Sequence, residues 1–289
     1  MKEIIITTGP LVGLGDHLIY STLAERFTAL GHKVFLDADT TARNDETLDI
    51  VWKRNPHIVG LSDKKPNAGY VHQGAFFDEL QKYPLGANLE VMERVHGLPP
   101  PYSISPRIYY EPQPFYTDLS NTVLWDYSAL SSTIHDDGWD AFMTKMRDRF
   151  AGREIVLVQQ LAEVGGRRNI PLPGAIPTIA VRSIYQYVDM LASCYAWVGS
   201  EAGGQALAAA VRGPHDVWDY DARPEVVSLM TVGTFNSRAF CYRGVDYRTS
   251  RLSAGLDYLE PAEVPLHRYH VTCRTNGNKL MEEWRFARQ

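Results

Sequence analysis

The chain has 289 residues, 45% hydrophobic and 22% charged, the composition of an ordinary globular protein with one or two domains. A formal net charge of -5 gives no electrostatic footprint for DNA or RNA, so nucleic acid is not an expected partner. No apolar run approaches the ~20 residues of a membrane span, and the first residues lack the pattern of a signal peptide. We therefore expect a cytoplasmic protein without a membrane span.

The cysteines are Cys194, Cys241 and Cys273, widely separated and without a CxxC pair. This spacing predicts free thiols in a reducing compartment rather than a zinc site or a disulfide framework.

The first elements along the chain form a strand, a glycine loop, a helix and a second strand. Lys2–Thr8 contains the β-branched run Ile4–Ile6, which is typical of a buried parallel strand. Apolar residues then recur at helical spacing between the glycine loop and Gly31: Leu18, Ile19, Leu23, Phe27 and Leu30. Val34–Leu36 begins the next strand. This is a βαβ unit, and such units bind ligands at the carboxyl ends of their strands.

The glycine loop, Gly9–Gly15, is compatible with dinucleotide binding. Gly13-Leu14-Gly15 supplies the first two glycines of a G-x-G-x-x-G fingerprint, and Asp37 and Asp39 lie about where a ribose-binding acid is found. An NAD(P)-dependent oxidoreductase is therefore one alternative.

Asp16, at the first turn of the helix, weakens that alternative. The third glycine of the fingerprint is replaced by Leu18, and a carboxylate at the helix start competes with a phosphate for the same amides. The position suits a general base whose pKa the helix dipole keeps low, or a capping acid without a chemical role.

The remainder of the first half alternates between strand and helix patterns. We predict a strand over residues 58–61 and helices over 74–82 and 89–95. A proline-rich stretch over 99–114 follows, with a short strand expected at 107–111, and residues 117–137 are irregular by pattern. The aromatic residues of the proline-rich region are expected to pack on the amino-terminal unit, with stacking on a sugar or base as the alternative.

A second unit begins with the predicted strand 155–158, after a helix over 139–150. Ser183 is expected to cap a helix, which leads to a strand at 195–199, a turn at 200–204, an alanine-rich helix at 205–211 and a strand at 226–232. A helix is predicted near the end, at 279–288. The two strand-loop-helix starts predict two Rossmann-like domains, residues 1–148 and 149–289.

Two segments resemble family 9 glycosyltransferases, the heptosyltransferase-like group with GT-B architecture. The first is Gly13-Leu14-Gly15-Asp16 opening a long helix; the second is Ser183–Val211, with Ser200-Glu201-Ala202-Gly203-Gly204 before the alanine-rich helix. The resemblance implies an α/β fold of the GT-B type, with two parallel sheets facing a central cleft. The terminal helix is expected to pack back on the first domain.

The resemblance also implies an activity and its site residues. It implies inverting transfer of a sugar from a nucleotide-sugar donor to an acceptor hydroxyl, with Asp16 as general base and a glycan intermediate as acceptor. The acceptor site is expected at Gly13, Gly15 and His17, although a surface location is the simpler expectation for His17. The donor site is expected at Ser200, Glu201, Gly203, Gly204, Gln159, Arg167 and Arg168.

Neither a metal ion nor a cofactor is expected, because helix amides and arginines can stabilise the departing diphosphate. Two departures from the family pattern leave room for a non-catalytic GT-B binding protein. Gln205 and Ala206 stand where a histidine is usual after the donor-loop glycine. Gln159 and Gln160 follow the strand 155–158, where a lysine or hydroxyl pair is usual.

Overall fold

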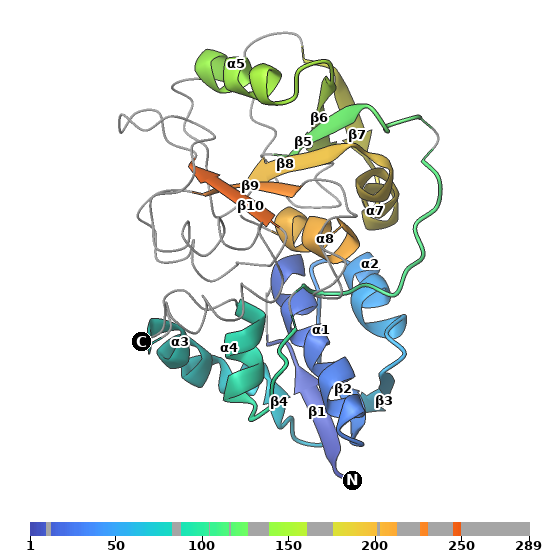
Figure 1. Ribbon diagram of the computed structural model, residues 1–289. Coiled ribbons are helices and arrows are strands. Elements are labelled where there is room, and N and C mark those ends of the chain that lie inside the picture. Colours follow the sequence, from blue (N-terminus) through green and yellow to red (C-terminus); the bar gives the residue numbers. More distant parts are fainter. Residues whose placement is uncertain are drawn as a thin grey trace.

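A computed structural model of the chain describes residues 1–9, 13–82, 88–103, 105–115, 117–126, 139–160, 176–200, 203–212, 226–230 and 245–249. It contains two parallel sheets, one for each half of the described chain (Figure 1). The predicted helix at 279–288, and its packing on the first domain, lie outside the described residues.

The amino-terminal sheet has the strand order β3-β2-β1-β4, so its first strand is central. Ile4, Ile5 and Ile6 of β1 are all buried, as expected for a strand covered on both faces. The strands are β1 (Glu3–Thr7), β2 (Lys33–Asp37), β3 (Ile58–Ser62) and β4 (Ala68–Gly69). The helices are α1 (Leu14–Ala29), α2 (Asp45–Leu48), the π-helical turn η1 (Asp49–Lys53), the 3-10 turn η2 (Tyr70–His72), α3 (Gln73–Lys82) and α4 (Asn88–Val95).

The second sheet has the order β10-β9-β8-β5-β6-β7. Its strands are β5 (Thr122–Asp126), β6 (Glu154–Gln160), β7 (Thr178–Val181), β8 (Ala196–Ser200), β9 (Val226–Met230) and β10 (Val245–Thr249). Its helices are α5 (Trp139–Arg149), α7 (Ile184–Ser193) and α8 (Gly203–Arg212). The predicted cap of α7 is confirmed, because the Ser183 hydroxyl oxygen accepts a 3.0 Å hydrogen bond from the Gln186 N–H.

Strand β5 corrects the predicted division of the chain. Val123 pairs with Ile155 of β6 on one side and with Ala196 of β8 on the other, so β5 is central to the second sheet. The prediction of irregular structure was wrong for residues 122–126, and the second sheet begins well before residue 149. The run Val123–Trp125 is too short to stand out among polar neighbours, and only its two buried partner strands make it a strand.

The segment between the sheets packs on both domains. Residues 107–111, predicted as a short strand, join neither sheet. The hydroxyl of Tyr109 donates to Glu25 of α1 at 3.3 Å, whereas the hydroxyl of Tyr110 donates to Asp189 of α7 at 3.1 Å. The expected packing role of the aromatic residues is confirmed for these two tyrosines, and for Tyr110 it extends to the second domain.

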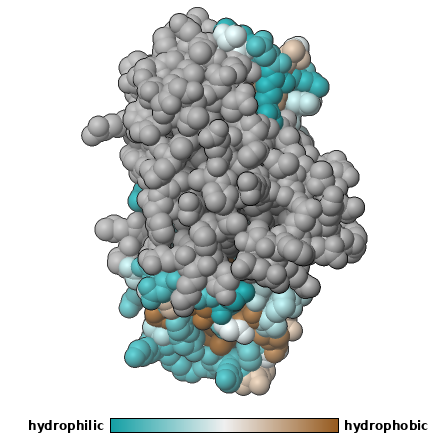
Figure 2. Space-filling view, turned by 60° about the vertical axis from the view of Figure 1, so that its left-hand side comes forward, coloured by the Kyte–Doolittle hydropathy of each residue, from teal (hydrophilic) through white to brown (hydrophobic). Residues whose placement is uncertain are grey.

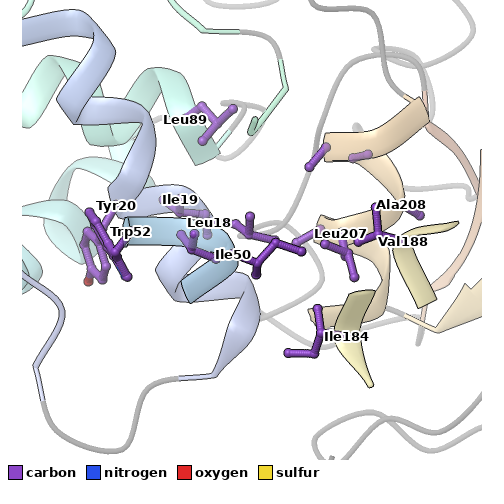
Figure 3. Close-up of a cluster of buried hydrophobic side chains, with 14 of the residues drawn as sticks. Leu18, Ile19, Tyr20, Ile50, Trp52, Leu89, Ile184, Val188, Leu207 and Ala208 are labelled. Atoms are coloured by element: carbon purple, nitrogen blue, oxygen red, sulfur yellow. The ribbon is translucent and has the colours of Figure 1, made fainter. Parts of the chain in front are cut away.

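One continuous hydrophobic core joins the two halves. It includes Leu18 of α1 and Ile50 of η1 from the first domain, together with Ile184 of α7 and Leu207 of α8 from the second. Figure 3 shows these side chains converging from the two sides of the contact. The domains therefore bury apolar surface against each other rather than meeting only through the connecting segment.

The surface is mixed in character. On the face seen in Figure 2, hydrophobic residues of the lower, coloured part are interspersed with hydrophilic ones. Within the described ranges, no helix has the length and apolar character needed to cross a membrane.

Candidate functional site

Asp16 lies at the start of α1, where its carboxylate closes the first turn. The Gly13 N–H donates a 3.0 Å hydrogen bond to Asp16 Oδ2, which satisfies one of the amides that a helix N-terminus leaves free. The side chain is half-buried. Burial raises the pKa of Asp16 above its usual value, and the Gly13 N–H and the charge of Arg43 offset this only in part. The expectation of a low pKa was therefore wrong in direction, because loss of water outweighs the helix terminus.

The first turn of α8 lies directly against the first turn of α1. A Cβ built on Gly203 would lie 3.2 Å from Leu14 Cβ and 3.4 Å from the Gly15 nitrogen. A Cβ on Gly15 would lie 3.6 Å from Gly203 Cα. A side chain at position 203 would thus press on the first turn of α1, and glycine leaves room for this close contact. Two helix N-termini, one from each domain, meet beside Asp16, and both present partial positive charge.

The start of α8 also lies at the topological switch point of the second sheet. β5 and β8 are adjacent, and the strands that follow each of them run outward to opposite edges. In open α/β sheets, ligands bind outside the carboxyl ends of the two strands at such a point. Here those ends are Asp126 of β5 and Ser200 of β8. The expected donor loop therefore leaves the sheet at its favoured ligand-binding position.

The predicted strand 155–158 exists as β6, but it is not the first strand of the second sheet. Gln159 belongs to β6, which lies beside β5 and away from the switch point, and its partner is Ala180 of β7. The first strand of the second sheet is β5, so the comparison of Gln159 with the family's lysine or hydroxyl pair used the wrong strand. The residues that follow β5, 127–138, lie outside the described chain.

His17 is a core residue and not a surface one. Its side chain is fully buried, and its Nδ1 accepts a 3.0 Å hydrogen bond from Trp52 Nε1. Burial lowers the pKa of His17 to about 4, so the ring is neutral and carries its proton on Nε2. Among the described residues, Nε2 has no hydrogen-bond partner.

Some of the remaining predicted site residues are described by the structure, and others lie outside the described residues. Gly13, Gly15 and Gly204 are described: Gly15 lies against Gly203 of α8, Gly13 precedes α1 beside Asp16, and Gly204 lies on Asp126. Glu201, Arg167 and Arg168 lie outside the described residues.

Sequence reasoning missed two polar residues of this region. Asp126 is buried at the end of β5, directly below Gly204. Arg43 is exposed and close enough for its charge to lower the pKa of Asp16. The sequence signal for Asp126 was an acid directly after an apolar run. No local pattern signals Arg43, because only the fold brings it near Asp16.

Within the described ranges, no three His, Cys, Asp or Glu side chains gather closely enough to hold a metal ion. Cys194 is a buried free thiol, and burial raises its pKa to about 11. The prediction of a free thiol is confirmed for this cysteine; Cys241 and Cys273 lie outside the described residues.

No protein-family model matches the chain, and no curated protein matches it significantly in sequence. Solved structures do match. One is the iron-containing dodecameric glycosyltransferase TibC of enterotoxigenic E. coli, at 14% identity and a TM-score of 0.54, with 100% of this chain and 77% of TibC covered. The described part of this chain has no ligand set that fits such an iron.

Two further solved structures agree with this likeness. The complex of the heptosyltransferase TibC with ADP-D-beta-D-heptose matches at 14% identity and a TM-score of 0.53, covering 100% of this chain and 76% of TibC. A family 9 glycosyltransferase of Veillonella parvula matches at 11% identity and a TM-score of 0.51, covering 99% of this chain and 97% of that one. The chain therefore has the heptosyltransferase-like GT-B fold that its sequence motifs predicted.

Proposed function

We propose that this chain is an inverting glycosyltransferase, which moves a sugar from a nucleotide-sugar donor to a hydroxyl of a glycan intermediate. One observation carries the proposal: Asp16 belongs to the first turn of α1, and the neighbouring Gly15 lies against Gly203 in the first turn of α8, which begins at the switch point of the second sheet. A proton acceptor from one domain and an anion-binding helix start from the other are thus adjacent.

In the proposed reaction, the acceptor hydroxyl attacks the anomeric carbon opposite the bond to the donor diphosphate. Asp16 Oδ1 takes the hydroxyl proton while Oδ2 stays bonded to the Gly13 N–H. The carbon–oxygen bond to the diphosphate breaks, and the nucleoside diphosphate departs. The raised pKa of Asp16 suits this role, since a stronger base takes a hydroxyl proton more readily.

The departing diphosphate is proposed to lie at the start of α8. The amides of Gly203 and Gly204 offer hydrogen bonds there, and the helix dipole favours negative charge. Glu201 is proposed to bind hydroxyl groups of the donor, with Arg167 and Arg168 completing the site. These groups stabilise the leaving group without a metal ion, so we expect activity to survive EDTA.

Asp16 also argues against dinucleotide binding at the Gly9–Gly15 loop. Its carboxylate occupies the Gly13 N–H that a pyrophosphate would need, and it adds a negative charge at that point. The glycine at position 9 is explained without a dinucleotide. Its φ is +70°, and a Cβ there would lie 2.5 Å from the Tyr70 ring.

The test is release of nucleoside diphosphate from nucleotide sugars in the presence of candidate acceptor glycans. ADP-heptose is the first donor to try, since TibC binds it. Asp16→Asn keeps an oxygen that can accept from Gly13 and removes the base, so we expect turnover to fall about 10²- to 10⁴-fold. Affinity for the donor should change little, and Glu111→Gln, a change of an exposed acid between the domains, serves as control.

Each other outcome has a distinct meaning. Unchanged turnover in Asp16→Asn would remove Asp16 from the base role. Tight donor binding by the wild type without release, with any acceptor or with water, would point to a non-catalytic binding protein. Binding of NAD or NADP in place of every nucleotide sugar would point to an oxidoreductase.

A further inference from the structure

Beneath the donor loop lies a buried hydrogen-bonded chain that links the sheet to α7. Trp197 Nε1 donates to the hydroxyl oxygen of Tyr187 at 2.8 Å, and that hydroxyl donates to Asp126 Oδ2 at 2.5 Å. All three side chains are buried, with Trp197 at 0%, Asp126 at 2% and Tyr187 at 3% exposure. They come from β8, β5 and α7, so their hydrogen bonds connect three separate elements.

This unit contacts both ends of the loop expected to hold the donor. At the start of the loop, a Cβ on Gly199 would lie 2.2 Å from the Trp197 ring and 2.5 Å from the Asp126 carbonyl oxygen. At its end, a Cβ on Gly204 would lie 2.8 Å from Asp126 Oδ2. Both glycines therefore let the backbone rest on the unit, and no larger residue fits without a shift.

Charge favours the same arrangement. The Asp126 carboxylate lies below the first turn of α8, where the helix dipole stabilises a negative group. Tyr187 is held between Trp197 and Asp126, which fixes the direction of its hydroxyl proton. The hydrogen bond from Tyr187 thus holds the carboxylate beneath the first turn of α8.

We infer that Asp126 is a positioning residue for the donor site, acting with Tyr187 and Trp197 to hold Gly199 at the end of β8 and Gly204 in the first turn of α8. This inference rests on the proposed function for its ligand, a nucleoside diphosphate group, but its geometry is independent of that function. Asp126 acts through the backbone of the loop and does not contact the reacting atoms.

The test compares Asp126→Ala, Asp126→Asn and Tyr187→Phe with a matched control. Ser105→Ala is that control. The buried Ser105 hydroxyl donates to the carbonyl of Ala209 at 2.8 Å, and Ala209 belongs to α8 but lies beyond its first turn. The two readouts are hydrogen exchange of the amides of residues 199–206 without ligand, and the dissociation constant for ADP.

Removing a buried hydrogen-bond partner should weaken ADP binding about tenfold in Asp126→Ala and Tyr187→Phe. Exchange at 199–206 should rise in the same variants. Asp126→Asn keeps an acceptor for Tyr187 and should lie closer to the wild type in both readouts. Ser105→Ala should leave both unchanged, even where it lowers the melting temperature.

Unchanged exchange and unchanged ADP affinity in Asp126→Ala would overturn the inference. So would equal effects in Ser105→Ala, which would mean that any loss of stability loosens the loop. If the wild type binds neither ADP nor the UDP, GDP and CDP probes, the proposed function fails. The exchange data then decide by themselves whether Asp126 positions the loop.

Discussion

At the residue scale, the environment of Asp16 combines burial with two favourable partners. Burial raises its pKa, whereas the Gly13 N–H and the charge of Arg43 lower it, and burial is the larger effect. A carboxylate whose pKa is raised is a better proton acceptor, once ionised, than one in water. The side chain is thus suited to deprotonate an acceptor hydroxyl.

The pH dependence of turnover follows from this environment. Activity requires ionised Asp16, so kcat/KM should fall as the pH decreases through the pKa of Asp16 in the free enzyme. Since that pKa is raised, the acidic limb should lie above the ordinary aspartate value. Arg43→Gln removes a charge that lowers the pKa, so this variant should move the limb further up. A limb unaffected by Arg43→Gln would mean that the titrating group is not Asp16.

The place of some residues could be predicted from the sequence and that of others could not. Gly13, Gly15 and the acid after them predicted that Asp16 lies in the first turn of a helix, because capping is a local property. The burial of His17 against Trp52 depends on a residue far along the chain, and nothing near His17 signals it. The contact of Asp126 with Gly204 is equally non-local.

At the scale of elements, the contact between α1 and α8 determines the geometry of the site. The two helices approach through Gly15 and Gly203, and these glycines bring the first turns together. The site therefore depends on small residues at the helix starts as much as on the groups that carry charge.

The two glycines should differ in their tolerance of alanine. Gly203→Ala places a Cβ 3.2 Å from Leu14 Cβ and should lower the unfolding free energy; overpacking of this kind costs about 1–3 kcal/mol. Gly15→Ala makes only ordinary contacts, so improved helix propensity should offset them within about 1 kcal/mol. Urea unfolding of both variants measures the difference, and equal costs would contradict the described helix contact.

The elements with strong apolar patterns were predicted correctly, among them α1, α4, α7, α8 and β8. Strand β5 was missed, since its five residues owe their conformation to the two strands that flank it. Because of this omission, the prediction made β6 the first strand of the second sheet and placed the domain boundary after β5. Sequence patterns identify elements with local signals, whereas sheet order depends on pairing across the chain.

At the scale of the whole molecule, burial raises the pKa values of some titratable groups and lowers those of others. Burial lowers the pKa values of His17 and His96 to about 4 each. Glu93 is fully buried, and burial raises its pKa to about 7 despite Arg26 at 3.1 Å. The two histidines therefore make the free energy of unfolding rise with pH, whereas Glu93 makes it fall.

The signs can be tested with Glu93→Gln. Each histidine binds fewer protons when folded, so its contribution to stability is present above about pH 6.5 and lost towards pH 4. Glu93 binds more protons when folded, so its contribution is present below about pH 4.5 and lost towards pH 7. Removing it should steepen the rise of the unfolding free energy between about pH 5 and 6.5, by at most about 1.4 kcal/mol per pH unit.

Urea unfolding at several pH values, for the wild type and for Glu93→Gln, checks this prediction. Parallel curves for the two proteins would show that Glu93 has the same proton affinity in the folded and unfolded chain, contrary to its buried position.

The central claim is that a nucleotide sugar binds where α1 and α8 meet. Calorimetric titration of the wild type, Glu201→Ala and the control Glu111→Ala with ADP-, UDP-, GDP- and CDP-sugars, and with NAD and NADP, tests it most directly. The wild type and Glu111→Ala should bind one nucleotide sugar equally and neither dinucleotide, and Glu201→Ala should bind that sugar about tenfold more weakly. Binding of a dinucleotide alone, or equal affinity in all three proteins, would contradict the claim.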